Sequence, residues 1–429
     1  MKLLIKGGTV VDPAAGTLPE MDVLVENGVI TGVDRGIEAP GPDTDVVDAS
    51  GKLVTPGLID MHVHLREPGY EAKETIESGC GAAVRGGFTA VACMPNTDPV
   101  TDNKTVVRYI LEKARQANLA RVYPVGAITR GSMGRELSEM AGMKEAGAVA
   151  VSDDGKPVAD AGVMRRAMQY ASMVGLTVIS HCEEPSLFAG GVMNEGYNST
   201  RLGLKGIPAA AEEVMVARDI ILAELTGCRL HIAHVSTAGS VRLIREARAR
   251  GVRVTAEVTP HHFTLTDSAV EGYNTSTKVN PPLRGEDDLA AIKEGIADGT
   301  IDVIATDHAP HTAEEKDVEY DRAPFGLVGL ETAVGLVWTE LVAKGIISPA
   351  RAVAMMSANP ARILGLGDRS ISVGAVADIT LIDPELRETV NPDNFRSKGR
   401  NTPFAGRELK GLPVMTIVGG RIVYRANSE

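Results

Sequence analysis

The sequence predicts an α/β protein in which a (β/α)8 barrel carries a small β-module formed by both ends of the chain. Two patterns predict this architecture. Strand-like apolar runs alternate with amphipathic helical stretches through the middle of the chain, whereas short strand patterns occupy its two ends. The chain has 429 residues, of which 44% are hydrophobic. It is therefore long enough for one large barrel and an additional module.

The two ends of the chain share a β-rich pattern. Residues 1–55 alternate apolar and polar side chains between turns that contain Gly, Asp and Asn. Residues 367–429 have the same character in ADITLIDP and VMTIVGGRIVYR, and no helix-length pattern follows the first of these. Because chain termini often lie close together, we expect residues 1–55 and 367–429 to form one composite β-domain.

The middle of the chain, residues 56–366, reads as repeated βα units. Helical stretches such as NKTVVRYILEKARQAN separate the strand candidates, which predicts a parallel sheet covered by helices. Periodicity alone also permits an open, doubly wound sheet. The eight strand candidates span residues 57–64, 89–96, 121–129, 148–154, 176–183, 229–236, 252–260 and 302–310.

The polar residues of these strands favour the closed barrel. His, Asp and Asn recur at the carboxyl ends of the strand candidates, where barrel enzymes place their chemistry. A doubly wound sheet would more often begin with a glycine-rich phosphate turn. No G-x-G-x-x-G follows the first strand, and no P-loop lysine motif is present. We therefore expect the functional site on one barrel rim and no nucleotide cofactor of these types.

Charge and cysteine content exclude several classes of protein. Lys and Arg total 44 against 56 Asp and Glu, a formal charge of −12 without a basic stripe, which argues against a nucleic-acid partner. The four cysteines form no CxxC pair, so no disulfide framework is expected. The sequence shows no signal-peptide pattern and no run of about 20 apolar residues. We expect a reduced, soluble, cytoplasmic protein without a membrane partner.

A metal site is indicated first by His62 and His64. Two residues apart on a predicted strand, they point to the same side, so both imidazoles can reach one cation. An isolated HxH is as often structural as it is metal-binding.

Further nitrogen and oxygen donors end other strand candidates. His181, His234 and Asp307 each end one of these strands, and Asp153 and Asp154 end another. Each of them alone would more often be an ordinary polar residue at a strand end. Together with the HxH pair they fit one or two divalent metals with nitrogen and oxygen ligands, with zinc as the leading candidate.

Longer motifs resemble a known family. DMHVHLREPG, MPNTDP and ATDHAPHTAEEK resemble signatures of the dihydroorotases of the amidohydrolase superfamily, particularly the class I bacterial enzymes. The similarity extends through VTPGLIDMHVH, KVNPPLR, PFG and SKGRNTPFAG. The resemblance implies a TIM-like metal-dependent hydrolase barrel with a composite β-sandwich domain. It also implies the reversible cyclisation of N-carbamoyl-L-aspartate to L-dihydroorotate plus water in de novo pyrimidine (UMP) biosynthesis.

The resemblance also assigns the metal ligands. It places His62, His64 and Asp307 on the more buried metal, and His181 and His234 on the second. Two zinc ions per subunit are expected.

The ligand that bridges the two metals differs from that of many relatives, which use a carboxylated lysine. This chain has SDDG at that place, as class I dihydroorotases do, and Asp154 matches their bridging carboxylate. Asp153 is the alternative, with a turn or helix-cap hydrogen bond as its structural role. One-metal occupancy stays open, because an aspartate is shorter than a carboxylated lysine.

The resemblance implies a substrate site that grips a carboxylate and a pyrimidine-like ring. A dianionic ligand needs a fixed local cation, and the guanidinium of Arg66, on the same strand face as His64, can bind a carboxylate bidentately. A surface salt bridge is the alternative role for Arg66. The substrate-binding residues implied are His64, Arg66, Asn96, Asn280, His311, Phe325 and Gly326.

In the implied mechanism, a metal-bound hydroxide attacks the ring carbonyl and Asp307 acts as general acid and base. The polar segment 311–321 is predicted to be a mobile loop near the site. We expect mainly structural roles for His231, His261 and His262, with His231 on the strand face opposite His234.

Two other functions stay open. One is a hydantoinase, dihydropyrimidinase or allantoinase, against which Arg66 with Asn96 and the missing lysine argue. The other is a non-catalytic partner subunit of aspartate transcarbamoylase, against which the complete ligand set argues. An active chain could still pair with the transcarbamoylase, and we expect a homodimer.

Overall fold

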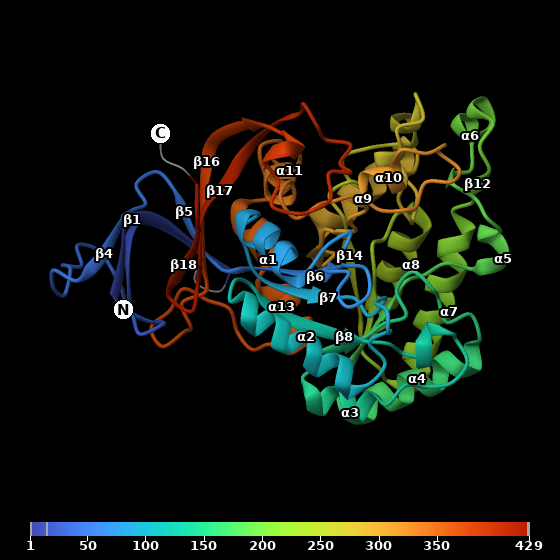
Figure 1. The fold of residues 1–429 in the computed structure, drawn as a ribbon, viewed down its shortest axis with the longest axis horizontal. Coiled ribbons are helices and arrows are strands. Elements are labelled where there is room, and N and C mark those ends of the chain that lie inside the picture. Colours follow the sequence, from blue (N-terminus) through green and yellow to red (C-terminus); the bar gives the residue numbers. More distant parts are fainter. Residues whose placement is uncertain (1, 14–15, 427–429) are drawn as a thin grey trace.

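The computed structural model describes residues 2–13 and 16–426 and contains the predicted barrel (Figure 1). Eight strands, all paired in parallel, form one sheet in the order β15-β14-β13-β10-β9-β8-β7-β6. One of them overlaps each strand candidate of the middle region. They are β6 (Leu58–Val63), β7 (Phe88–Cys93), β8 (Arg121–Gly126), β9 (Ala150–Val151), β10 (Thr177–Ser180), β13 (Leu230–Ile232), β14 (Val254–Val258) and β15 (Val303–Ile304).

The sheet nearly closes between its first and last strands. Val63 and His308 form an isolated parallel bridge, and the His64 amide donates to the His308 carbonyl over 2.8 Å. The Thr306 amide lies 3.2 Å from both carboxylate oxygens of Asp60. The two end strands, β6 and β15, meet near the polar residues at their carboxyl ends. The barrel prediction is therefore confirmed, and the open doubly wound alternative is wrong.

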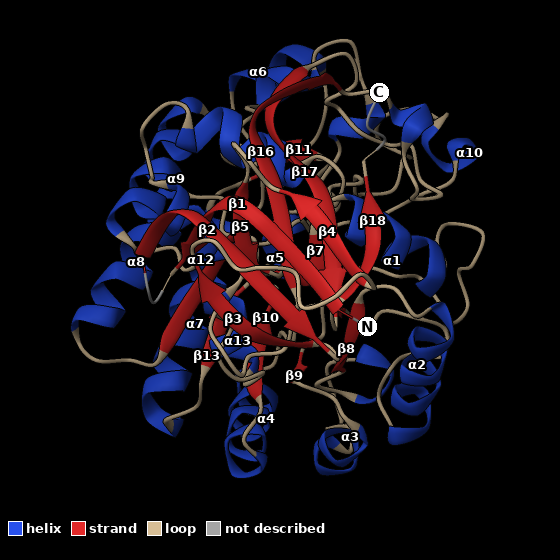
Figure 2. Cartoon of the chain, turned by 90° about the vertical axis from the view of Figure 1, so that its left-hand side faces the viewer, coloured by secondary structure: helices blue, strands red, loops and turns tan. Residues whose placement is uncertain are grey.

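Helices surround the barrel, as Figure 2 shows from the side of the β-module. Residues 104–117 form a helix because apolar side chains recur three or four residues apart, and because the Asn103 side chain accepts from the amides of Thr105 and Val106. The helices around the barrel include α1 (Ile76–Arg85), α2 (Lys104–Ala117), α3 (Met140–Ala146), α4 (Ala161–Val174), α7 (Ala210–Thr226), α8 (Ala238–Ala249), α9 (Glu286–Asp298), α11 (Ala333–Val337), α12 (Pro349–Met356) and α13 (Ala358–Leu364).

Short elements fill the connections. They are η1 (Arg130–Ser132), α5 (Pro185–Phe188), β11 (Met193–Asn194), α6 (Tyr197–Leu202), β12 (Gly206–Ile207), η2 (Asp267–Val270), η3 (Thr275–Thr277), α10 (Ala313–Lys316), the π-helical turn η4 (Trp338–Val342) and η5 (Pro392–Asn394). Among the described residues, no helix combines the length and the apolar character that crossing a membrane requires.

Both ends of the chain contribute strands to a second sheet, at the left of Figure 1. Its order is β18-β17-β16-β5-β1-β2-β3, and β4 pairs with β1. The sheet joins the two termini where β5 pairs with β16 in antiparallel register, with Val54 opposite Leu381. Its strands are β1 (Lys2–Asp12), β2 (Gly16–Glu26), β3 (Val29–Asp34), β4 (Thr44–Asp48), β5 (Leu53–Pro56), β16 (Ile379–Thr389), β17 (Glu408–Val418) and β18 (Arg421–Arg425). The domain boundaries at 55/56 and 366/367 stay predictions.

One part of the C-terminal segment leaves this sheet. The connection between β16 and β17 packs against the barrel, where Phe395 and Phe404 share an apolar cluster with Val328 and Leu336. From the sequence, all of 367–429 is expected in the β-domain. No pattern in the sequence distinguishes the residues that contact the barrel.

The segment 311–321, predicted to be a loop, contains the helix α10. Thr312 and Glu315 form a capping box around its first turn. The Lys316 ammonium is buried and donates to the carbonyls of Thr275 and Pro324, over 3.1 and 2.7 Å. These local contacts explain why the polar segment has regular structure.

Candidate metal centre and substrate site

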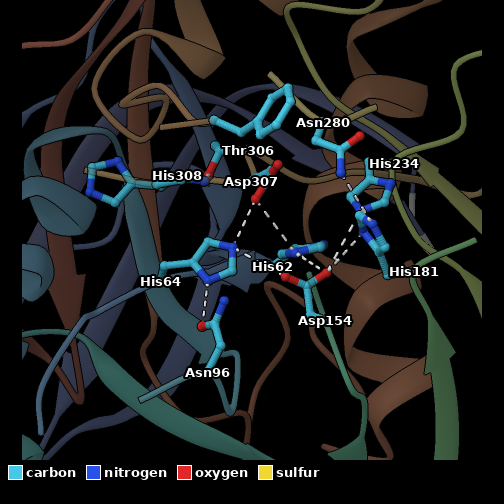
Figure 3. Close-up of polar contacts among 12 residues, drawn as sticks. His62, His64, Asn96, Asp154, His181, His234, Asn280, Thr306, Asp307 and His308 are labelled. Atoms are coloured by element: carbon cyan, nitrogen blue, oxygen red, sulfur yellow. Dashed lines mark hydrogen bonds and ion pairs between the residues drawn. The ribbon is translucent and has the colours of Figure 1, made fainter. Parts of the chain in front are cut away.

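The candidate metal ligands gather at the carboxyl ends of the barrel strands (Figure 3). His62 lies within β6 and His64 directly follows it. The other four follow further strands: Asp154 after β9, His181 after β10, His234 after β13 and Asp307 after β15. Parallel strands bring their carboxyl ends to one rim, so side chains far apart in the sequence meet there.

Asp154 lies at the centre of this cluster. Its Oδ1 is 3.3 Å from His62 Nε2, 3.6 Å from His181 Nδ1 and 3.7 Å from His234 Nε2. Its Oδ2 is 3.5 Å from His64 Nε2. Burial raises the pKa of Asp154, but the surrounding histidines lower it well below its usual value. The carboxylate is therefore ionised and available to cations on either side.

Two overlapping groups of donor atoms fit metal ions. His62, His64 and Asp154 offer ligand atoms within 4.8 Å of one another, and so do Asp154, His181 and His234. His62 Nε2 and Asp154 Oδ1 are buried without a hydrogen-bond partner. Buried polar atoms left unpaired are costly, and a bound cation would satisfy both. Asp154 belongs to both groups, as a bridging ligand would.

Asp307 faces the first group. Its Oδ1 lies 2.9 Å from His64 Nε2 and 3.6 Å from His62 Nε2. The chain has left β15 here and turns, with Asp307 at a φ of 49°. Burial raises the pKa of Asp307, but His62 and His64 lower it well below its usual value. Asp307 is thus an ionised carboxylate beside the candidate metal ligands.

Asp153 does not join the cluster. Its Oδ1 accepts from the amides of Ile128 and Thr129, over 2.8 and 3.1 Å, and its Oδ2 accepts from the Thr129 hydroxyl. These bonds give it the turn-stabilising role that the sequence left open.

The sequence did not reveal a buried carboxylate behind His62. Glu257 Oε1 accepts from His62 Nδ1 over 2.5 Å, and Glu257 Oε2 lies 3.1 Å from His231 Nε2. Burial raises the pKa of Glu257, whereas His62 and His231 lower it, to about 2. A carboxylate that accepts from a ligand imidazole fixes which ring nitrogen faces the metal. The signal was the one acidic residue in the strand candidate VRVTAEVTP.

His231 was expected on the strand face opposite His234, and its position in the structure corrects this. Its Nδ1 lies 2.8 Å from Thr255 Oγ1, and its other nitrogen faces Glu257. It therefore belongs to the hydrogen-bonded group beneath the cluster. The expected alternation fails because β13 ends at Ile232, and His234 has a φ of 32°.

Arg66 and Asn96 adjoin the first ligand group. Asn96 Oδ1 accepts from His64 Nδ1 over 2.8 Å. Arg66 donates to the Pro310 carbonyl over 3.2 Å, and its Nη2 lies 3.4 Å from His311 Nε2. Arg66 has a φ of 62° beyond the end of β6. A turn, rather than strand alternation, therefore brings it to the site.

Asn280 and Phe325 lie among other side chains of this rim. The Asn280 amide nitrogen is 3.5 Å from His181 Nε2, and its oxygen is buried without a partner (Figure 3). The Phe325 ring packs 6.1 Å from that of Phe188, and its carbonyl accepts from His311 Nε2 over 2.9 Å. Gly326 follows, and a Cβ there would lie 2.7 Å from Ala309 Cβ.

Comparison with known proteins identifies the family. A family model described as dihydro-orotase-like matches residues 51–240. A dihydroorotase from Pelotomaculum thermopropionicum is 70% identical over 423 residues, which cover 99% of this chain and 98% of that protein. The chain belongs to the dihydroorotase family. A dihydroorotase from Pelobacter propionicus is 57% identical over 425 residues, which cover 99% of this chain and 100% of that protein.

Solved structures similar to this member of the dihydroorotase family include hydantoinases. L-hydantoinase (dihydropyrimidinase) from Arthrobacter aurescens has a TM-score of 0.89 at 27% identity, covering 99% of this chain and 96% of that one. D-hydantoinase (dihydropyrimidinase) from Thermus sp. has a TM-score of 0.86 at 27% identity, covering 99% and 95%. The protein therefore has the amidohydrolase architecture and belongs to a family of hydrolases, and its candidate metal ligands lie together at the barrel rim.

The remaining histidines pack around this dihydroorotase-family site. His262 Nε2 donates to the Pro281 carbonyl over 3.0 Å, and its Nδ1 accepts from the Thr259 hydroxyl. His261 is buried against the His262 ring, with centroids 4.5 Å apart. Burial lowers the pKa of His262 to about 4. His261 Nε2 is buried without a hydrogen-bond partner, and the structural role of the pair stays a prediction.

Proposed function

We propose that the protein catalyses the reversible cyclisation of N-carbamoyl-L-aspartate to L-dihydroorotate plus water in de novo pyrimidine biosynthesis. The observation that carries the proposal is a guanidinium, Arg66, beside a cluster of imidazole and carboxylate groups that could hold metal ions. The names of relatives at up to 70% identity over nearly the whole chain support it.

Zinc is the metal we propose, with two ions per subunit. His62, His64 and Asp307 would hold one ion, His181 and His234 the other, and Asp154 both. Imidazole nitrogens and carboxylate oxygens without thiolates suit zinc. A bound cation of this kind lowers the pKa of water and polarises a carbonyl group.

Asp307 moves the proton. As an ionised carboxylate it accepts a proton from the attacking water and delivers it to the ring nitrogen when the ring opens. In the cyclisation direction it takes a proton from the carbamoyl nitrogen as that nitrogen attacks the side-chain carboxyl group. It then gives this proton to the departing carboxyl oxygen, which leaves as water.

The substrate carboxylate would bind Arg66 and Asn96. The half-buried Arg66 has the carboxylates of Asp307, Glu315 and Asp154 near its guanidinium. Burial lowers the pKa of Arg66, although these carboxylates raise it. A guanidinium remains charged there and can bind a carboxylate through two hydrogen bonds. We propose that Asn280, His311 and the backbone of Phe325 and Gly326 bind the rest of the substrate, in part through the unpaired Asn280 oxygen.

The proposal is tested by comparing the turnover of one ring that carries a carboxylate, L-dihydroorotate, with that of two rings that do not. The purified metal-loaded protein should open L-dihydroorotate much faster than dihydrouracil or hydantoin. Arg66→Lys should reduce this preference, because an ammonium cannot bind a carboxylate bidentately. Faster turnover of hydantoin or dihydrouracil would contradict the proposal and support the second candidate, a hydantoinase, which the similar solved structures favour.

Location and partnership are further parts of the proposal. The four cysteines are all buried and free, which suits a reducing cytoplasm. We propose that the chain is active as a homodimer. Assays of the isolated chain, with and without aspartate transcarbamoylase, would show whether that partner raises its activity.

A further inference from the structure

We propose that Asn401, from the C-terminal segment, is a positioning residue for substrate binding. It fixes two backbone segments of the barrel, 309–311 and 325–326, at the spacing that the substrate needs. The inference rests on the proposed function, because those segments carry His311 and the Phe325–Gly326 backbone. Asn401 itself touches backbone groups of the barrel.

The Asn401 side chain joins the two segments directly. Its Oδ1 accepts from the His311 amide over 3.2 Å, and its Nδ2 donates to the carbonyls of Ala309 and Gly326, over 3.3 and 3.0 Å. Its own carbonyl accepts from the Val328 amide over 2.9 Å. Asn401 is only 6% exposed, so water does not readily replace these bonds.

The chemistry of the position requires an amide. One acceptor faces an N–H group and two donor hydrogens face two carbonyls, which an asparagine satisfies and an aspartate does not. The segments are also tightly packed, because a Cβ at Gly326 would lie 2.9 Å from the Ala309 carbonyl oxygen and 3.3 Å from His311 Nε2. A shift of one segment therefore displaces the other.

Residues 396–401 are themselves hydrogen-bonded to the barrel. The amides of Arg396 and Ser397 donate to the Glu331 carboxylate, over 2.9 and 3.2 Å. The Ser397 hydroxyl and the Lys398 amide donate to Glu74. These contacts place Asn401 relative to the barrel independently of the substrate segments.

The backbone at Gly399, two residues before Asn401, is equally constrained. A Cβ at Gly399 would lie 2.8 Å from both Pro310 Cβ and Val328 Cγ1. The segment therefore passes close to the backbone that carries His311. Asn401 can hold segments 309–311 and 325–326 in place because its own segment and both of these pack tightly.

Asn401→Asp is the direct test. The substitution keeps the size and the acceptor for His311, but it places an oxygen against the carbonyls of Ala309 and Gly326. We expect the KM for dihydroorotate to rise about tenfold or more, whereas kcat changes less than about threefold and bound metal is unchanged. Asn391→Asp, at an exposed cap of η5 in the same connection, is the matched control and should keep the original KM.

Several outcomes would overturn the inference. These are an unchanged KM in Asn401→Asp, or a fall in kcat and bound metal without a KM change. Should Asn401→Asp not fold, Asn401→Ala carries the test, and a raised KM at full metal content supports positioning. Failure of both variants to fold would instead assign Asn401 a structural role. Absence of dihydroorotate turnover by the unsubstituted protein would contradict the proposed function itself.

Discussion

Glu257 is a buried carboxylate directly behind a candidate metal ligand. Glu257→Gln keeps the size but removes the charge that His62 Nδ1 and His231 face. We expect metal affinity to fall about 10–100-fold, because the ligand imidazole loses its orientation and part of its basicity. Metal titration of the metal-free protein measures this, with exposed Glu246→Gln as the control. Equal affinities in all three proteins would exclude this role.

Asp307 carries the proton transfer in the proposed mechanism. Asp307→Asn removes the base but keeps the shape, and kcat for dihydroorotate should fall about 10²–10⁴-fold. Steady-state assays at saturating metal and substrate measure this, with exposed Asp287→Asn as the control. A loss smaller than tenfold would show that another group carries the proton.

Some residues of the site could be predicted from the sequence because of their type and place. His62 and His64 form an HxH at a strand end, and Asp154 follows another strand, so barrel geometry alone brings them together. Glu257 and Asn401 could not be predicted in the same way. One is the only acidic residue of its strand, and the other lies in a segment whose partners are far away in the sequence.

At the scale of elements, α10 and its flanking residues form one side of the proposed substrate site. Glu315 pairs with Lys73 over 2.8 Å and with His311 over 3.1 Å. Lys316 is anchored on the Pro324 carbonyl. Replacing residues 313–319 with a glycine–serine linker should lower kcat/KM for dihydroorotate at least about tenfold, because these contacts order His311 and the backbone before Phe325.

Kinetics of the linker variant at full metal content provide the measurement. A linker of the same length, rather than a deletion, avoids straining the ends of the segment. Kinetics equal to those of the original protein would show that the segment is an exposed connection without a role in binding. Whether it moves during turnover stays a prediction.

The strands were predictable as elements because each is an apolar run that ends in polar residues. Their limits were not. β9 and β15 are only two residues long in the structure, because their polar ends turn away to form the site. The helix α10 was not predicted because its sequence has few apolar residues. Its capping box alone did not distinguish it from a polar loop.

At the scale of the whole molecule, β16 joins the C-terminal segment to the N-terminal one. Leu381 is 1% exposed and lies opposite Val54 of β5. Leu381→Ala should lower the free energy of unfolding by about 2–5 kcal/mol, because it leaves a cavity in the core of the β-module. Leu386→Ala on the same strand, at 38% exposure, should have a much smaller effect.

Urea unfolding monitored by circular dichroism compares these two variants with the original protein. Equal losses would mean that the joint sheet does not stabilise the molecule. The composite module was predictable because both chain ends carry strand patterns. The packing of residues 396–401 against the barrel was not predictable, because it depends on backbone contacts that leave no periodic pattern in the sequence.

Metal content and position test the central claim most directly. Crystals of the metal-replete protein should show anomalous density for zinc about 2.0–2.2 Å from the imidazole nitrogens and from Asp154. Chelation should remove this density together with dihydroorotate turnover, and added zinc should restore both. A metal-replete protein that turns over dihydroorotate with no ion among these imidazoles would contradict the account.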